Sequence, residues 1–229
     1  MTIAASPGLF DVRIVAAGKG GIRWGRIGIL GGTFDPVHNG HLLLGEQAYR
    51  EYGLDEIWFM LSGHPPHKKG RLVTEGKERE DMVKLAIASV PYFVYSDFEL
   101  KREGNTYTAQ TLTLLKEAYP QHEFYFIIGA DSLYEIEQWY HPELVMKQAV
   151  LLAAARTYEK DHRDFEKQIN YLQEKYGARI GMIQFKEMDI SSRQIRKAVG
   201  SGQSVEKLVP GSVAGYIRIH GLYREAFDD

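Results

Sequence analysis

The sequence predicts an α/β fold, a doubly wound parallel sheet of the Rossmann-like kind. Short apolar runs alternate with stretches of helical spacing, and each stretch is long enough to cross over to a parallel strand. Two of the apolar runs end in glycine, and a helix start follows each of them. After its first residues the chain has neither a linker of disordered composition nor a repeat of fixed period, so the elements are expected to share one sheet.

Six apolar runs are the predicted strands, and they cover residues 27–30, 56–61, 93–95, 124–129, 150–154 and 180–183. The predicted helices between them cover residues 39–53, 76–89, about 106–118, 130 onward and 163–176. In the second helix, Met82, Leu85 and Ala86 are expected on the apolar side. Asn105 or Thr106 is expected to cap the third helix.

The C-terminal part is predicted to be helical from about residue 190. A helix over 190–199 opens with two hydroxyl residues, and two small helices are expected at 205–208 and 213–219. The first core strand begins only near Gly25, so residues 1–24 are interpreted as an N-terminal extension ahead of a single domain over 25–229.

Composition excludes several classes of protein. A chain of 229 residues can bury about 70% of its unfolded surface, so its core can be stable without disulfides or structural metal ions. It has no cysteine, which excludes disulfides and thiolate zinc sites and favours a cytoplasmic location. The net charge of -2 argues against a nucleic-acid partner. No apolar run approaches the roughly 18 residues of a membrane helix, so no membrane partner is expected, and a homo-oligomer is left open.

Residues 27–45 are the stretch around which the site is expected to form. Gly31 and Gly32 end a strand and let a ligand approach bare backbone amides. His38 and His41 stand at the start of the next helix, and their separation of three residues places both imidazoles on one side of its first turn. The unpaired N–H groups and dipole of that turn favour a nearby anion by about 0.3–1 kcal/mol. The pattern predicts a phosphate site, with surface capping by the two histidines as the alternative.

The stretch matches neither common glycine-rich signature. No Gly-Lys-Ser/Thr triplet follows the glycines, and a third glycine for dinucleotide binding is missing. The chain also lacks cysteine, and it has no obvious serine nucleophile on a sharp strand-to-helix turn. The chemistry is therefore expected to be transfer between groups that already carry charge, which depends on alignment and charge stabilisation.

The string from Gly31 to His41 resembles the first signature, Gly-Gly-Thr-Phe-Asp-Pro-x-His-x-Gly-His, of the nucleotidyltransferase superfamily. In particular it is similar to that of the bacterial nicotinate-nucleotide adenylyltransferases. The resemblance implies transfer of AMP from ATP to nicotinate mononucleotide in NAD biosynthesis, giving nicotinate adenine dinucleotide and pyrophosphate, with Mg2+ neutralising the leaving group. It implies that His38 and His41 bind the phosphates and stabilise the transition state. It also implies that the residues after the strand bind ATP, namely Gly31, Gly32, Thr33 and Phe34.

Further motifs extend the resemblance over about residues 25–222. The loop Pro65-Pro66-His67-Lys68 implies that His67 and Lys68 hold a substrate phosphate. The pattern before the helix at 108 implies that Thr108 binds the carboxylate of the pyridine ring. Trp139 is implied to stack on that ring, with Tyr140 beside it. Without this context, the basic loop is equally a solvated surface, and the tryptophan is an ordinary core residue.

Two motifs concern ATP. Residues 190–196 resemble the second superfamily signature, which implies that Ser191 and Arg196 engage the phosphates and that Ile190 belongs to the ATP site. Gly129 and Asp131 repeat the strand, glycine and helix arrangement at the same sheet edge. Asp131 is either a helix cap or a group that holds a ribose hydroxyl or acts through the metal.

The chain departs from the family pattern at two positions. Ser62 stands where relatives often carry an asparagine that contacts the mononucleotide, and Arg193 stands where the signature usually has threonine. Two other functions are kept open. One retains this machinery with phosphopantetheine or another phosphorylated alcohol as acceptor, or with CTP as donor. The other is a module that senses a nucleotide without turnover, although such a module would be expected to lose one of the two histidines.

Overall fold

A computed structural model describes residues 25–63, 73–102, 104–155, 159–184 and 190–224. Six strands form one sheet in the order β3-β2-β1-β4-β5-β6, and every neighbouring pair is parallel. The strands are β1 (Gly25–Gly32), β2 (Glu56–Leu61), β3 (Phe93–Ser96), β4 (His122–Gly129), β5 (Val150–Ala155) and β6 (Arg179–Gln184). The predicted doubly wound sheet is confirmed. Its strand order reverses at β1 and β4, which is where ligands of such sheets bind.

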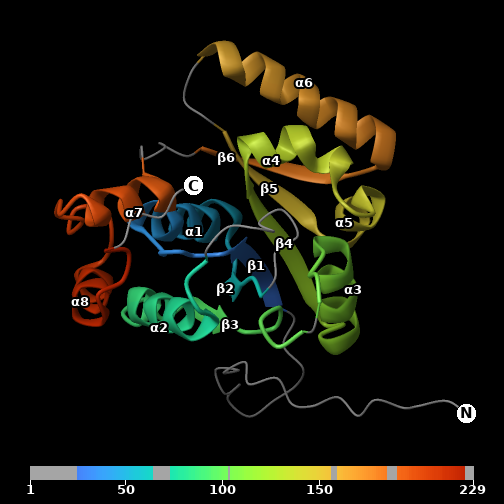
Figure 1. Cartoon of the computed structure of the whole chain (residues 1–229). Coiled ribbons are helices and arrows are strands. Elements are labelled where there is room, and N and C mark those ends of the chain that lie inside the picture. Colours follow the sequence, from blue (N-terminus) through green and yellow to red (C-terminus); the bar gives the residue numbers. More distant parts are fainter. Residues whose placement is uncertain (1–24, 64–72, 103, 156–158, 185–189, 225–229) are drawn as a thin grey trace, which may run out of the picture.

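Helices cover both faces of the sheet (Figure 1). One layer holds α1 (Asn39–Tyr52), α2 (Gly76–Ile87), α7 (Ser192–Gly200) and α8 (Gly211–His220). The other holds α3 (Thr108–Ala118), α4 (Ala130–Glu135), the 3-10 turn η2 (Ile136–Gln138), α5 (Pro142–Gln148) and α6 (Glu159–Tyr176). None of the helices in these described ranges combines the length and the apolar character that a membrane crossing needs.

Each layer packs its own hydrophobic core against the sheet. Ile27 and Ile29 of β1 point into the core of α3, α4, α5 and α6, whereas Leu30 points into the core of α1, α2, α7 and α8. The central strand thus alternates between two buried faces, as a parallel strand covered on both sides does. The carboxyl end of β1 is thereby held at a fixed position relative to both helical layers.

Three local predictions are wrong. Leu85 is 40% exposed, because the buried stripe of α2 runs through Met82, Val83, Ala86 and Ile87. The N-cap of α3 is Tyr107, so neither Asn105 nor Thr106 caps that helix. Residues 205–208 form a turn instead of a helix. The carbonyls of Lys207 and Leu208 accept hydrogen bonds from the side chain and backbone of Asn39, at the start of α1, and this tertiary contact fixes the turn.

Two glycine substitutions compare a filled position, where β6 packs against α1, with an open position in α8. A Cβ at Gly181 would overlap the phenol of Tyr52, whose hydroxyl donates to the carbonyl of Met182 at 2.8 Å. We expect Gly181→Ala to lower the free energy of unfolding by about 1–3 kcal/mol. At Gly215, inside α8, a Cβ would meet no atom within 4 Å. Gly215→Ala should raise stability by about 0.5–1 kcal/mol. Urea unfolding measures both, and changes of the same sign would contradict this packing.

Candidate active site

The turn after β1 is shaped by Phe34. This residue has a φ of 48°, in the left-handed region, and its side chain is buried. Its ring packs on Phe59 and edge-on against His41, with centroids 5.8 and 5.0 Å away. A Cβ at Gly32 would lie 2.9 Å from the Phe34 ring, so glycine is needed there for packing. Gly31 is exposed, and a Cβ there would meet nothing closer than 3.8 Å. The backbone of Gly31 is therefore open, whereas Gly32 and the side chain of Phe34 are packed.

His38 and His41 form a stacked pair at the start of α1. Their ring centroids lie 3.6 Å apart with an interplanar angle of 25°, which confirms that both imidazoles project from one side of the first turn. The backbone N–H of His38 donates to Nδ1 of His41 at 3.2 Å. A neutral imidazole whose Nδ1 accepts carries its proton on Nε2. The capping interpretation is thus correct for Nδ1 of His41, and Nε2–H is left as a donor.

Burial keeps both rings neutral near pH 7. It lowers the pKa of His38 from 6.5 to about 4. The pKa of His41 also lies well below its usual range, first because of burial and second because of the neighbouring His38. Neutral imidazoles stabilise phosphate oxygens through N–H donors and dipoles, and a bound polyphosphate would oppose both shifts. The backbone N–H groups of the first turn of α1 add to this field.

Helix α7 docks on the residues just before the histidines. The hydroxyl of Ser192 donates to the carbonyl of Pro36 at 2.8 Å, and Nη1 of Arg196 donates to the carbonyl of Asp35 at 2.8 Å. Ser191 is the N-cap: its hydroxyl accepts from the N–H of Gln194 at 3.2 Å, and its own N–H donates to the Gln194 amide oxygen at 2.7 Å. The guanidinium of Arg196 is thereby brought to the turn that carries the histidine pair. Ile190, just before the cap, packs against the core of the same layer.

The end of β4 lies beside that of β1, at the same edge of the sheet. Gly129 is exposed, and a Cβ there would have no atom within 4 Å. Gly129 is also the N-cap of α4, so the interpretation of Asp131 as the helix cap is wrong; its exposed carboxyl lies in the first turn of α4. Within the described ranges, no three His, Asp or Glu side chains gather in a way that could hold a metal ion.

The residues assigned to the mononucleotide come from two neighbouring segments. Thr108 is the first residue of α3, and its neighbour Tyr107 packs on Tyr140 with ring centroids 4.5 Å apart. Trp139 is half-buried, and its ring meets that of Phe126 edge-on at 6.3 Å. The structure therefore brings Thr108 close to the Trp139-Tyr140 pair. Part of the tryptophan does belong to the core, as the alternative interpretation held.

Ser62 lies beside the glycine turn. Its N–H donates to the carbonyl of Gly32 at 2.9 Å, and its own carbonyl accepts from Nη1 of Arg79 at 3.0 Å. Arg193 is exposed in the first turn of α7. The predicted contacts of His67 and Lys68 lie outside the described residues.

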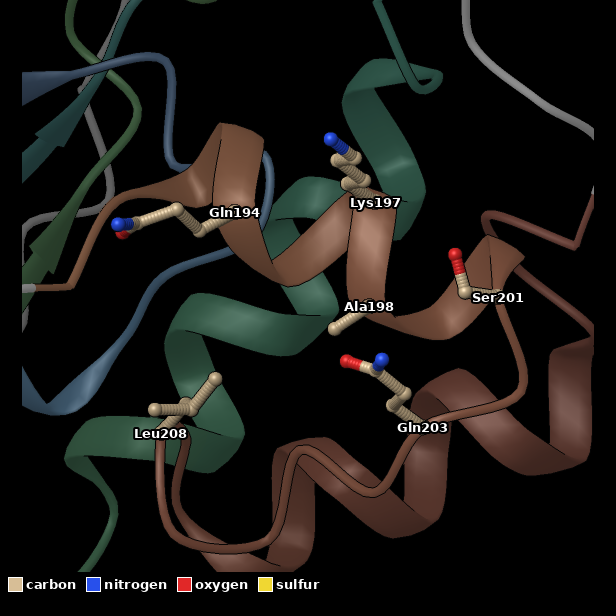
Figure 2. A pocket seen from close by; sticks show the side chains of 6 residues that line it. All are labelled: Gln194, Lys197, Ala198, Ser201, Gln203 and Leu208. Atoms are coloured by element: carbon tan, nitrogen blue, oxygen red, sulfur yellow. The ribbon is translucent and has the colours of Figure 1, made fainter.

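A separate pocket of about 360 Å³ lies between α7 and the segment that follows it (Figure 2). In the figure, Ala198, Gln203 and Leu208 face one another, whereas Lys197 projects away from them. The residues that line the pocket are Gln194, Lys197, Ala198, Ser201, Gln203 and Leu208. None of them was assigned to ATP or to the mononucleotide.

Sequence reasoning missed three buried residues around the turn. Asp35, Arg79 and Tyr223 are 3%, 4% and 3% exposed, respectively. Asp35 stands inside the first signature but was given no role. Arg79 gave a signal that was overlooked, since a charge on the buried side of α2 needs partners. Tyr223 follows α8, far along the chain from the other two, and no local pattern marks it.

Comparison with known proteins places the chain in a family. Residues 29–198 match the model of the cytidylyltransferase-like family. The probable nicotinate-nucleotide adenylyltransferase of Lachnoclostridium phytofermentans is 46% identical over 198 residues, which cover 86% of this chain and 98% of the relative. The chain belongs to the nicotinate-nucleotide adenylyltransferases. The probable nicotinate-nucleotide adenylyltransferase of Dehalococcoides mccartyi is 41% identical over 86% of this chain and 97% of its own length.

Solved structures of distant adenylyltransferases share the fold. The Plasmodium falciparum nicotinic acid mononucleotide adenylyltransferase complexed with NaAD superposes with a TM-score of 0.73 at 22% identity, over 89% of this chain and 100% of that one. The same enzyme complexed with APC gives a TM-score of 0.72 at 21% identity and the same coverage. The Rossmann-like nucleotidyltransferase fold that the sequence predicts is thereby confirmed.

The lowered pKa of His38 makes stability depend on pH. Below pH 6.5 the unfolded chain binds a proton at His38 that the folded chain, with its pKa of about 4, does not bind. The corresponding stability is present above pH 6.5 and is lost as the pH falls toward 4. Between pH 7.5 and pH 5, the free energy of unfolding falls by about 2 kcal/mol because of His38. In His38→Gln, we expect the fall in the free energy of unfolding over this interval to shrink by about that amount. An equal fall in variant and wild type would show that His38 is not buried as a neutral ring.

Proposed function

We propose that this protein transfers AMP from ATP to nicotinate mononucleotide, forming nicotinate adenine dinucleotide and pyrophosphate. The observation that carries the proposal is the stacked, neutral histidine pair on the turn that also holds Arg196. The names of relatives at 46% and 41% identity support the choice of substrates, and the complex of a structural neighbour with NaAD is consistent with it.

The reaction needs no nucleophilic side chain. An oxygen of the mononucleotide phosphate attacks the α-phosphorus of ATP in line, a new phosphorus–oxygen bond forms, and the bond to the leaving pyrophosphate breaks. The attacking phosphate is already ionised, so no strong base is required. Alignment of two such reactants can supply about 7–11 kcal/mol. Preorganised donors aimed at the developing charge supply the remainder of the catalysis.

We assign the donors to the turn after β1 and to α7. Nε2–H of His41, the His38 ring and the Arg196 guanidinium would bind the triphosphate and stabilise the transition state. The exposed backbone at Gly31 and the segment from Ile190 to Ser191 would line the ATP site. The carboxyl of Asp131 is suited to accept a ribose hydroxyl. ATP would enter as its magnesium complex, with Mg2+ held mainly by phosphate oxygens and water, as is usual for this ion.

We assign the pyridine ring to Trp139, with its carboxylate received at the start of α3. Thr108 offers a hydroxyl there, and the Tyr107–Tyr140 contact keeps the two segments together. One nearby carboxylate is paired with a cation: Glu137 accepts from Nζ of Lys175 at 2.8 Å. The negative field of Glu137 on an anionic ring is therefore reduced. The contacts of Ser62, His67 and Lys68 with the mononucleotide stay predictions, as do the cytoplasmic location and a homo-oligomer.

Pyrophosphate release is the decisive assay. ATP and magnesium are supplied with nicotinate mononucleotide, nicotinamide mononucleotide or phosphopantetheine in parallel reactions, and CTP replaces ATP in a further set. We expect turnover with ATP and nicotinate mononucleotide. Turnover only with phosphopantetheine or only with CTP would replace the proposed substrates, and ATP binding without turnover on any acceptor would identify a sensor.

His41→Ala removes one preorganised donor. We expect turnover to fall at least about 100-fold, while ATP affinity weakens far less, because the lost contact acts mainly on the transition state. His220→Ala, on an exposed part of α8, is the control and should keep wild-type turnover. Steady-state kinetics and equilibrium binding of ATP provide the comparison. Equal losses in turnover and affinity would mean that His41 only holds the ground state.

Trp139→Ala tests the stacking assignment. Loss of an aromatic platform should raise the KM for nicotinate mononucleotide by about 10-fold and leave the KM for ATP unchanged, since stacking of a base-like ring contributes about 1–3 kcal/mol. Tyr134→Ala, which removes a 43% exposed ring of α4, is the matched control. An unchanged mononucleotide KM in Trp139→Ala would remove the tryptophan from the site.

A further inference from the structure

The carboxyl of Asp35 is the point at which distant segments meet beneath the site. It lies three residues before His38 and is 3% exposed. Its Oδ1 accepts from the hydroxyl of Tyr223 at 2.7 Å, and its Oδ2 accepts from the N–H of Thr74 at 3.3 Å. The backbone carbonyl of the same residue receives Arg196 at 2.8 Å. A shift of Asp35 would therefore move the histidine turn and the contact of Arg196 together.

Tyr223 reaches this carboxyl from the segment after α8. Its side chain is 3% exposed, and its φ of 62° lies in the left-handed region. For a tyrosine that conformation costs roughly 1–3 kcal/mol, so surrounding contacts must hold it. Burial, and next the carboxyl of Asp35, raises the pKa of Tyr223, so its hydroxyl keeps its proton and donates. The hydrogen bond joins residues 188 positions apart.

Arg79 of α2 holds the other end of the turn. Its Nη1 donates to the carbonyl of Thr33 at 3.0 Å and to that of Ser62 at 3.0 Å, and its Nε donates to the carbonyl of Thr74 at 2.8 Å. Burial lowers the pKa of this guanidinium, and the facing Asp35 opposes the shift. Arg79 thus fixes the turn at Thr33, whereas the other end is held at Asp35. There the side-chain contacts are the hydrogen bonds of Tyr223 and Thr74.

We propose that Tyr223 is a positioning residue for the site: its hydrogen bond to Asp35 holds the turn that aims His38, His41 and Arg196 at the triphosphate. This role rests on the proposed function. Tyr223 itself touches no reacting atom. Without its hydroxyl, Oδ1 of Asp35 would lose its buried donor, and the carboxyl would have to turn toward a new partner. Donors displaced by a fraction of an ångström lose alignment, and a misplacement of about 1 Å can cost about 100-fold in rate.

The test compares two tyrosines of the C-terminal part. Tyr223→Phe removes only the hydroxyl that binds Asp35. Tyr216→Phe is the matched control, because the hydroxyl of Tyr216 also donates to carboxylates, those of Glu78 at 2.6 Å and Asp81 at 3.2 Å, instead of that of Asp35. Both variants are assayed well below their melting temperatures, where circular dichroism shows them fully folded.

We expect kcat of Tyr223→Phe to fall about 10-fold or more, with the KM for nicotinate mononucleotide within about twofold of wild type. Tyr216→Phe should keep wild-type kcat, whatever stability it loses. A wild-type kcat in Tyr223→Phe, or an equal loss in both variants, would overturn the proposal, because either result would mean that the hydroxyl acts only on stability.

A second measurement does not depend on turnover. The ring protons of His38 and His41, followed by NMR in the protein without ligand, should change chemical shift in Tyr223→Phe and not in Tyr216→Phe. Unchanged signals in Tyr223→Phe would overturn the positioning role even if the enzyme is active. If the wild type turns over no acceptor while the signals move as expected, the proposed function fails, and the coupling of Tyr223 to the histidine turn stands.

Discussion

The stacking of two imidazoles on one helical turn is the constraint on which the rest of the site depends. His38 and His41 lie 3.6 Å apart because both project from the first turn of α1, and the second ring caps the helix through Nδ1. Burial lowers the pKa of both rings, and repulsion from His38 lowers that of His41 further, so the pair stays neutral. A neutral His41 whose Nδ1 accepts carries its proton on Nε2, which can donate. The same few atoms thus set the geometry of the helix start and the protonation of both rings, and in the proposed function they bind phosphate.

Four parts of the surrounding fold hold the short turn before this pair. The turn follows β1 directly, at the point where the strand order reverses between β1 and β4. Helix α7 docks on it through Ser192 and Arg196, and α2 reaches it through Arg79. The segment after α8 adds Tyr223. Because elements from both ends of the chain meet at residues 33–36, the donors are fixed before any substrate arrives, which is what electrostatic preorganisation requires.

The sequence predicted features that depend on local spacing, and it failed where tertiary contacts decide. The histidine pair followed from a separation of three residues, and the strand runs followed from their apolar patterns. By contrast, Leu85 is exposed because of how α2 meets its neighbours, and the turn at 205–208 is set by hydrogen bonds from Asn39. Tyr223 could not be found this way, since its partner lies 188 residues away and no motif joins them.

The most direct test of the central claim is a crystal structure with a non-hydrolysable ATP analogue. We expect phosphate oxygens within about 3 Å of ring nitrogens of His38 and His41 and of the Arg196 guanidinium, with the two imidazoles still stacked. A triphosphate bound elsewhere, or histidine rings turned away from it, would contradict the account.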